Sequence, residues 1–176
     1  MWDGNGTIRG ITGSRSIRRT TRSCTRPHTR RALALDERRL DLDAVRAPRS
    51  AIAVDPNNAN HAYVVYSGYT INTPSQPGHV FSVTYDPAGP STTWTSLDNN
   101  IGDLPANSVA YDAVKDDLYV SSDFGVMKLP HASTSWTMAG TGLPVVQVPD
   151  LKIMPGVRRL YAATHGMSLW SMPLPG

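Results

Sequence analysis

Glutamate occurs once in this chain of 176 residues, as Glu37. Glycine and proline are plentiful instead, with fourteen residues of each. Glutamate is a favourable helix former, whereas glycine and proline interrupt helices and form turns. The composition therefore predicts an all-β fold.

Cysteine is equally scarce. Cys24 is alone in the sequence, which excludes an internal disulfide and a cysteine-based metal cluster. No apolar run is long enough to span a membrane, and no apolar signal-peptide core follows Met1. We therefore expect no metal, no cofactor and no membrane partner, and the sequence leaves the localisation open.

Basic residues are few outside the first fifty positions. Residues 1–50 contain twelve of the seventeen lysines and arginines and five of the fourteen acids, whereas residues 51–176 contain five and nine. Three interpretations of this basic segment are open: a nucleic-acid-binding arm, a transit peptide, or a disordered leader without a role. No aromatic residue lies between Trp2 and Tyr63, so nucleic acid is not an expected partner. We interpret residues 1–49 as a basic, disordered leader.

From Ser50 onward, short runs of alternating or β-branched residues lie between turn signals such as D-P, P-G and G-P. Runs of this kind predict β-strands. The first four runs are Ser50–Asp55, His61–Gly68, His79–Asp86 and Thr92–Asp98. The next four are Val109–Asp112, Leu118–Ser122, Gly125–Leu129 and Ser133–Met138, and the last three are Leu151–Ile153, Leu160–His165 and Leu169–Met172.

These runs repeat in register along the chain. Trp94 and Trp136 are 42 residues apart, and so are Tyr119 and Tyr161. A period near forty with four short strands in each unit is typical of propeller blades; an ordinary β-sandwich is the alternative. We predict a partial β-propeller of about three four-stranded blades, with an irregular or disordered N-terminal leader. The predicted units are residues 50–105, 106–144 and 145–176, the last of them incomplete.

The repeats resemble the BNR/Asp-box family, which includes sialidases, xyloglucanase-type glycoside hydrolases and sortilin-like receptors. The resemblance rests on S-A-I-A-V-D-P-N-N at Ser50–Asn58, W-T-S-L at Trp94–Leu97 and G-L-P at Gly142–Pro144. The closing L-Y-A-A-T-H-G-M-S-L-W-S-M at Leu160–Met172 is its most specific part. It implies a C-terminal fragment of a larger propeller from a secreted or cell-surface protein.

The Asp-box turn of this family, S-x-D-x-G-x-T-W, is altered in the present sequence. Asp86 lies eight residues before Trp94 rather than five, and His131 occupies the aspartate position before Trp136. These turns are structural in the family, so the changes affect local stability more than chemistry.

The segment before Ser50 lacks a blade pattern in its own reading frame. In a neighbouring frame, however, the codons for Gly13–His28 can encode I-A-V-D-P-T-N-x-x-V-L-Y-A-A-T, and in another frame those for Asp36–Val45 can encode T-N-G-G-S-T-W-T-R. These strings match two consecutive family motifs. We therefore hypothesise that residues from about 13 to 49 are an out-of-frame translation of a blade, which the coding DNA can test.

The sequence offers few residues for glycosidase chemistry. After Ser50 the arginines are Arg158 and Arg159, and there is no glutamate, so the arginine cluster and tyrosine–glutamate pair of a sialidase are absent from this chain. A two-carboxylate mechanism needs two facing acids. Asp55 and Asp112 follow matching strands, where a turn role explains them. We predict no catalytic residue, and Asp123, beside a glycine at a strand end, is the weak candidate.

His165 is the other weak candidate, with Asp123, for ligand binding. Both residues have a simpler interpretation as parts of strand ends, and the tryptophans as inter-blade packing residues. We therefore expect a non-catalytic propeller fragment with a structural role or a carbohydrate- or protein-binding role. The alternative is a part of a glycoside hydrolase whose catalytic residues lie in missing blades. The expected partners are the remaining blades or a second copy, because open blades expose apolar faces.

Overall fold

The computed structural model describes residues 49–72 and 78–176. The predicted leader, with Cys24, Glu37 and the segment hypothesised to be out of frame, lies outside the described residues, apart from Arg49. The described residues form eleven strands in three antiparallel sheets, with two short 3₁₀ turns, so the fold is all-β as predicted. We refer to the sheets as blades 1 to 3 in chain order.

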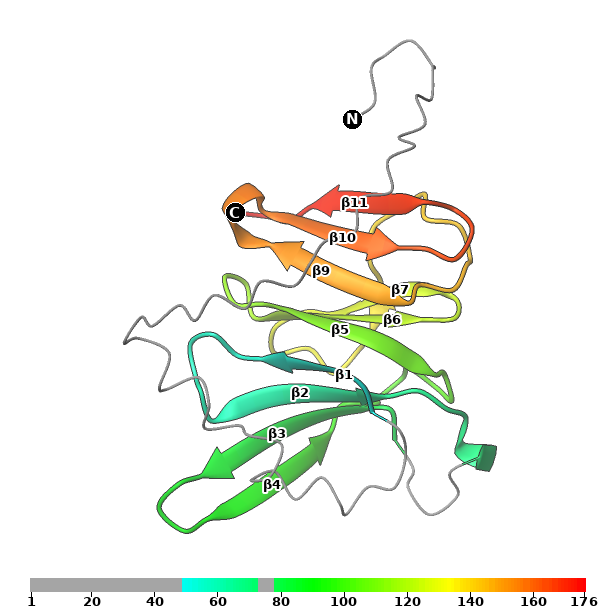
Figure 1. The fold of residues 1–176 in the computed structure, drawn as a ribbon. Helices are drawn as coiled ribbons and strands as arrows, with labels where there is room; N and C mark the ends of the chain where they lie inside the picture. The colour runs from blue at the N-terminus through cyan, green and yellow to red at the C-terminus, as the bar shows by residue number, and fades with distance from the viewer. Residues whose placement is uncertain (1–48, 73–77) are drawn as a thin grey trace, which may run out of the picture.

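Blade 1 is a four-stranded meander (Figure 1). It contains β1 (Arg49–Val54), β2 (His61–Tyr66), β3 (Val80–Asp86) and β4 (Ser91–Ser96), with the 3₁₀ turn η2 (Thr70–Asn72) after β2. The strands are rich in valine, tyrosine and threonine, which fit a pleated, half-buried surface. Each predicted strand of this blade is found within two residues of its expected bounds.

Blade 2 repeats the meander with a shorter last strand. It contains β5 (Ala106–Asp112), β6 (Asp117–Ser122), β7 (Gly125–Leu129) and β8 (Thr137–Met138). The fourth run was expected to be a strand from Ser133, and this expectation is wrong for its first four residues. The Ser133 backbone N–H donates to the Pro130 carbonyl oxygen and its hydroxyl oxygen accepts from the Ser135 N–H. This local turn takes the bonds that a strand would need.

Blade 3 has three strands in the order β11–β10–β9. They are β9 (Asp150–Met154), β10 (Arg159–Ala163) and β11 (Leu169–Pro173), and the 3₁₀ turn η3 (Pro155–Val157) joins the first two. The described part of the chain contains no fourth strand in this sheet. The blade is thus incomplete.

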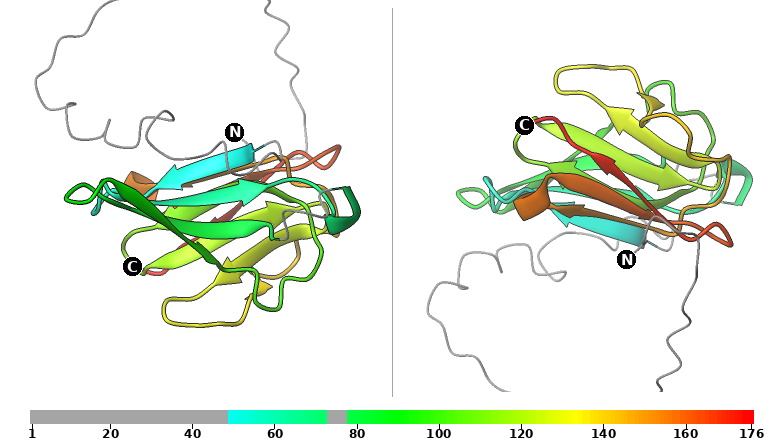
Figure 2. Two further views of the ribbon diagram at one scale, coloured as in Figure 1. Left: turned by 90° about the horizontal axis from the view of Figure 1, so that it is seen from below. Right: turned by 90° about the horizontal axis from the view of Figure 1, so that it is seen from above.

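The three blades stack face to face, with β5 of blade 2 lying between β1 of blade 1 and β9 of blade 3 (Figures 1 and 2). The first strands of successive blades are therefore neighbours, which is the arrangement around a propeller axis. This arrangement creates two rims. Rim 1 carries the turns at residues 55–60, 113–116 and 155–158, at the left of Figure 1, and rim 2 carries residues 67–72, 123–124 and 164–168.

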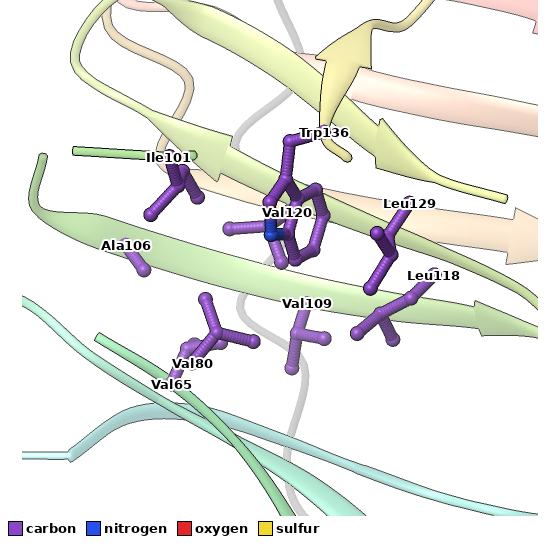
Figure 3. Close-up of a cluster of buried hydrophobic side chains, with 9 residues drawn as sticks. All are labelled: Val65, Val80, Ile101, Ala106, Val109, Leu118, Val120, Leu129 and Trp136. Atoms are coloured by element: carbon purple, nitrogen blue, oxygen red, sulfur yellow. The ribbon is translucent and has the colours of Figure 1, made fainter. Parts of the chain in front are cut away.

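The core consists of the layers between blades. Between blades 1 and 2, nine buried side chains form one cluster, to which blade 1 contributes Val65 and Val80 (Figure 3). A second layer between blades 2 and 3 includes Tyr119, Val148 and Leu160. Burying a side chain of this size stabilises the fold by about 1.5–3 kcal/mol. The interfaces between blades therefore hold the sheets together.

Trp136 belongs to the first of these layers, between blades 1 and 2. Its side chain is 3% exposed, and its indole N–H donates to the Leu97 carbonyl oxygen at 2.7 Å. Its backbone exchanges two hydrogen bonds with the Asn100 side chain. Trp136 therefore packs between blades, as its position in the repeat predicts.

Trp94 and Trp170, the other tryptophans among the described residues, are less enclosed. Trp94 is half-buried and packs edge-on against Phe81 on the face of blade 1 away from blade 2. Trp170 on β11 is 38% exposed. Inter-blade packing by Trp94 would require a further blade on that face of blade 1. Trp170 lies on the face of blade 3 that packs against blade 2, where it lines a small cavity with Leu160.

Candidate functional site

The two residues singled out from the sequence, Asp123 and His165, both lie on rim 2. The Asp123 carboxylate accepts hydrogen bonds from Asn107 Nδ2 at 3.0 Å and from Gln147 Nε2 at 2.8 Å. The His165 backbone N–H donates to the Gln147 carbonyl oxygen at 2.8 Å. Gln147 thus links the two candidates. The bonds of Asp123 tie β5 and the segment leading into blade 3 to the β6–β7 turn, which is a structural role.

A different cluster gathers on rim 1, in a cavity of about 400 Å³ between blades 1 and 2. Its walls combine leucines with polar and aromatic side chains. The polar and aromatic members are Asp55, His61, Tyr63, Ser82, Tyr111, Asp116, His131 and Ser133. None of these was selected from the sequence as a site residue.

Three of these residues form a hydrogen-bonded chain across blade 1. His61 Nε2 lies 2.8 Å from Ser82 Oγ, and His61 Nδ1 lies 3.3 Å from Asp55 Oδ2. The other carboxylate oxygen of Asp55 accepts the Asn57 backbone N–H at 2.8 Å. The imidazole is therefore held between a hydroxyl and a carboxylate that is fixed by its own turn.

The strand register explains why these side chains meet. Val54 pairs with Ala62, so Asp55 and His61 flank the β1–β2 turn. Tyr63 pairs with Ser82 in the β2–β3 ladder, which brings Ser82 beside the face that His61 and Tyr63 share. The spacing of Asp55 and His61 is visible in the sequence. Ser82 is brought in by a long-range pairing that the sequence does not specify.

Aromatic rings line the same cavity. The Tyr63 and Tyr111 rings lie 5.0 Å apart between centroids, and the His61 ring meets Tyr63 edge-on at 4.7 Å. Burial, aided by Asp55 and Asp116, raises the pKa of Tyr63 above its usual value. Burial and the hydrogen bond that it donates to Asp116 likewise raise the pKa of Tyr111. Both phenols are therefore neutral hydrogen-bond donors at physiological pH.

The cross-strand polar pair is a repeated feature of the blades. The position of His61 and Ser82 in blade 1 is occupied in blade 2 by Asp117 and Lys128, whose Nζ and Oδ2 lie 2.6 Å apart. In blade 3 it is occupied by Arg159 and Ser171, with Nη2 2.9 Å from Oγ. A pair at this position thus joins the second and third strands in every blade. Its chemistry differs from blade to blade.

The contact between neighbouring blades on rim 1 also differs. Between blades 2 and 3, Arg158 forms a bidentate ion pair with Asp112. Asp116 occupies in blade 2 the turn position that Arg158 occupies in blade 3, immediately before the second strand. Between blades 1 and 2, Asp55 and Asp116 both line the cavity, and Asp116 accepts a hydrogen bond from Tyr111 and pairs with His131. In place of an ion pair, the two turns at this junction are linked by a hydrogen bond from Asn57 Nδ2 to the Ala113 carbonyl oxygen at 3.3 Å.

A smaller cavity of about 80 Å³, lined by Trp170 and Leu160, lies between blades 2 and 3. Among the described residues, no group of three or more histidine, cysteine or acidic side chains has the arrangement of a metal site. No helix in the described ranges has the length and apolar character needed to cross a membrane.

Solved structures similar to this chain are β-propellers or propeller-type enzymes. The β-propeller domain of Swd1 from Myceliophteria thermophila aligns with 74% of this chain at 13% identity and a TM-score of 0.55. A gluconolactonase from Xanthomonas campestris aligns with 73% at 17% identity and a TM-score of 0.53. A GH74 enzyme from Niastella koreensis aligns with 73% at 18% identity and a TM-score of 0.51.

These similarities show the fold alone, because their sequence identities are low. The alignments cover 40%, 38% and 21% of the three neighbours, so the present chain has the fold of part of a propeller. No family model matches the chain, and no curated protein matches it in sequence. The partial β-propeller predicted from the repeats is confirmed.

Proposed function

We propose that the chain is part of a longer BNR/Asp-box propeller and that the rim 1 cavity binds a neutral saccharide. The observation that carries the proposal is the pairing of an aromatic wall, Tyr63 and Tyr111, with the carboxylates of Asp55 and Asp116 in one cavity. Residues 50–105, 106–144 and 145–176 serve as the blade units of this propeller.

The shape of the cavity suits a small ligand. Ligand sites are typically clefts of about 300–1,000 Å³ with aromatic and apolar walls and a few convergent polar groups. The rim 1 cavity lies within this range. The C–H face of a sugar ring can rest on a tyrosine, and its hydroxyls can donate to the carboxylates and accept from the phenols.

The charge of the cavity selects against acidic sugars. Its lining contains Asp55 and Asp116 but no lysine or arginine. A carboxylate-bearing sugar would meet two carboxylates and no lysine or arginine to balance its charge. This agrees with the lack of a sialidase arginine cluster in residues 51–176, and it favours an uncharged oligosaccharide.

Isothermal titration and two-dimensional NMR of the full chain test this function. Xyloglucan heptasaccharide and cellotetraose are the neutral probes, and sialyllactose is the acidic one. We expect binding of a neutral probe, shifts at Tyr63 and Tyr111, and a loss of at least tenfold in affinity for Tyr111→Ala. Trp170→Ala removes an aromatic ring outside the cavity and serves as the matched control. Preference for sialyllactose, or unchanged binding by Tyr111→Ala, contradicts the proposal.

The alternative is that the chain belongs to a glycoside hydrolase whose catalytic acids lie in blades outside this sequence. The fold shared with the GH74 enzyme and the sequence resemblance to xyloglucanase-type repeats favour it. Xyloglucan turnover by the product of the complete gene, absent from the 176-residue chain, would support this function. Turnover by this chain alone would contradict it.

The remaining blades of such a parent, or a second copy of this chain, are the proposed partners. The face of blade 3 away from blade 2 carries a groove of about 380 Å³ lined by Met154, Tyr161 and Leu169 among others, and Leu169 is 64% exposed. An exposed apolar sheet face of this kind is typical of an interaction surface. It is where a neighbouring blade would pack.

A further inference from the structure

We propose that Ser82, His61 and Asp55 form a nucleophile, a general base and an orienting carboxylate that hydrolyse an ester presented in the rim 1 cavity. The proposal deepens the saccharide site and rests on it for the substrate, an acylated neutral saccharide. The hydroxyl, the imidazole and the carboxylate themselves belong to this chain and line one cavity.

The distances fit the three roles. A nucleophile and its base must lie within about 2.6–3.2 Å, with the base oriented by a third group. Ser82 Oγ is 2.8 Å from His61 Nε2, and Asp55 Oδ2 is 3.3 Å from His61 Nδ1. In this arrangement Ser82 donates to Nε2, while Nδ1–H donates to Asp55 and fixes the imidazole tautomer.

Hydrogen bonds within the β1–β2 turn hold the Asp55 carboxylate in position. Asp55 Oδ1 accepts the Asn57 N–H, and the Asp55 N–H donates to the His61 carbonyl oxygen at 3.0 Å. The side chains of His61 and Asp55 are only 19% and 11% exposed. The β1–β2 turn therefore holds Asp55 against the imidazole, and the ionised carboxylate stabilises the imidazolium that forms when His61 takes a proton.

The reaction needs water and the ester alone. Ser82 Oγ attacks the acyl carbonyl carbon while its proton moves to His61 Nε2. Collapse of the tetrahedral intermediate breaks the bond between that carbon and the sugar oxygen, which leaves as an alcohol with the proton from His61. Water then attacks the acyl-Ser82 carbon and gives a proton to His61. When the bond from that carbon to Ser82 Oγ breaks, His61 returns the proton to Oγ, which releases the carboxylic acid and regenerates Ser82 and neutral His61.

The rest of the cavity suits such a substrate. Leu97, Leu118 and Leu129 provide an apolar surface for the acyl group. Tyr63 pairs with Ser82 across the strands and supplies a phenol that can donate to the carbonyl oxygen. The raised pKa of Tyr63 keeps that phenol protonated.

Blade 3 contains an internal comparison. Ser171 occupies the position of Ser82, but its partner there is the Arg159 guanidinium. Arginine stays protonated in proteins and cannot accept the serine proton. Ser82 and Ser171 thus occupy equivalent positions in the fold and differ in their hydrogen-bond partner. If both serines had only a structural role, we would expect them to react equally with a serine-directed reagent.

The experiment uses the full chain and a fluorophosphonate, which labels serines that have an adjacent base. Peptide mass spectrometry is expected to locate the label on Ser82, at least tenfold above Ser171. Ser82→Ala should abolish the label with a melting temperature close to that of Ser171→Ala. His61→Ala should slow labelling at least a hundredfold and Asp55→Asn at least tenfold, with Asp55→Glu partly restoring the rate.

The pH dependence adds a readout that packing alone does not provide. Labelling should accelerate as the pH rises, because Ser82 needs an unprotonated imidazole to accept its proton. Besides Asp55 and Ser82, the ionisable groups that face His61 in the cavity are Tyr63, Tyr111, Asp116 and His131. The acceleration should disappear in His61→Ala and persist in His131→Ala.

Two results would overturn the triad: no labelling of Ser82, or labelling that His61→Ala leaves unchanged. Labelling requires no saccharide, and saccharide binding can be measured with Ser82→Ala. Loss of saccharide binding with intact labelling therefore rejects the proposed ligand and keeps the triad. The converse rejects the triad and keeps the ligand.

Discussion

Arg158 forms a bidentate ion pair with Asp112, in which Nη1 lies 2.6 Å from Oδ1 and Nη2 lies 2.9 Å from Oδ2. The Asp112 side chain is 1% exposed and also accepts the Val114 N–H. The ion pair links the rim 1 turns of blades 2 and 3, which lie 46 residues apart in the chain. Between blades 1 and 2 the corresponding turns are linked by a neutral hydrogen bond instead, from Asn57 Nδ2 to the Ala113 carbonyl oxygen at 3.3 Å.

This ion pair makes stability depend on pH. Burial opposes ionisation of Asp112, but the hydrogen bonds from Arg158 and Val114 outweigh it and lower its pKa below the usual value. A carboxyl whose folded-state pKa is depressed stabilises the fold above its unfolded pKa of about 3.9 and loses this contribution as the pH falls through the folded-state pKa. Replacing Asp112 with alanine should cost about 2 kcal/mol at pH 7.

Urea unfolding of the parent chain and Asp112→Ala at pH 7 and near pH 3 measures the effect. The difference in free energy of unfolding should shrink at the lower pH. Asp86→Ala, which removes an exposed turn carboxylate that bonds the Ala88 N–H, is the control and should change stability much less. An equal difference at both pH values would contradict the assignment.

Replacing Trp136 and replacing Trp170 should lower the stability of the chain by different amounts. Trp136 is buried between blades 1 and 2, whereas Trp170 is partly exposed on β11. Trp136→Ala should destabilise the chain by about 3–5 kcal/mol because it leaves a cavity in the layer and removes the bond to Leu97. Trp170→Ala should cost about 1 kcal/mol or less. Calorimetric melting of the two variants checks this order, and equal losses would show that the first layer does not limit stability.

Ala132 lies on the rim 1 cavity with a left-handed backbone, φ 56°. This conformation costs an L-residue about 1–2 kcal/mol, and glycine adopts it freely at an entropic cost of its own. Ala132→Gly should therefore stabilise the chain by up to about 1 kcal/mol. The same change at Ala88, which has no positive φ, should lower stability instead. Thermal melting of both variants gives the comparison, and a lower melting temperature for Ala132→Gly would count against it.

Much of the fold follows from the sequence, because alternation and turn residues are local signals. The runs at Ser50–Asp55 and Gly125–Leu129 predict strands at or within one residue of the observed bounds. The repeat also places Asp123 and His165 at matching strand ends, and both lie on rim 2. The prediction of a strand from Ser133 was wrong because an alternating serine pattern is compatible with a turn as well as with a strand.

The rim 1 cavity depends on non-local structure. Ser82 joins His61 through strand pairing across a 21-residue separation, and Tyr111 and Asp116 reach them only because blade 2 stacks on blade 1. A turn role accounts for Asp55, as its bond to Asn57 shows. Its second carboxylate oxygen, which faces His61, becomes visible only in three dimensions.

The contrast between the two junctions gives the last prediction. Asp116 and Arg158 occupy the same turn position with similar left-handed backbones, φ 56° and 47°. Asp116→Arg should therefore place a guanidinium toward Asp55 as Arg158 is placed toward Asp112. We expect the melting temperature to rise by an amount equivalent to about 1 kcal/mol, because attraction of the guanidinium to Asp55 should outweigh the lost contacts of Asp116 with Tyr111 and His131. The new side chain should also fill the cavity and compete with His61 for Asp55. Saccharide binding and serine labelling should then both fall, whereas Asp116→Asn, which removes the charge without adding bulk, should preserve the cavity. A destabilised Asp116→Arg variant, with binding and labelling unchanged, would show that the two junctions are not equivalent.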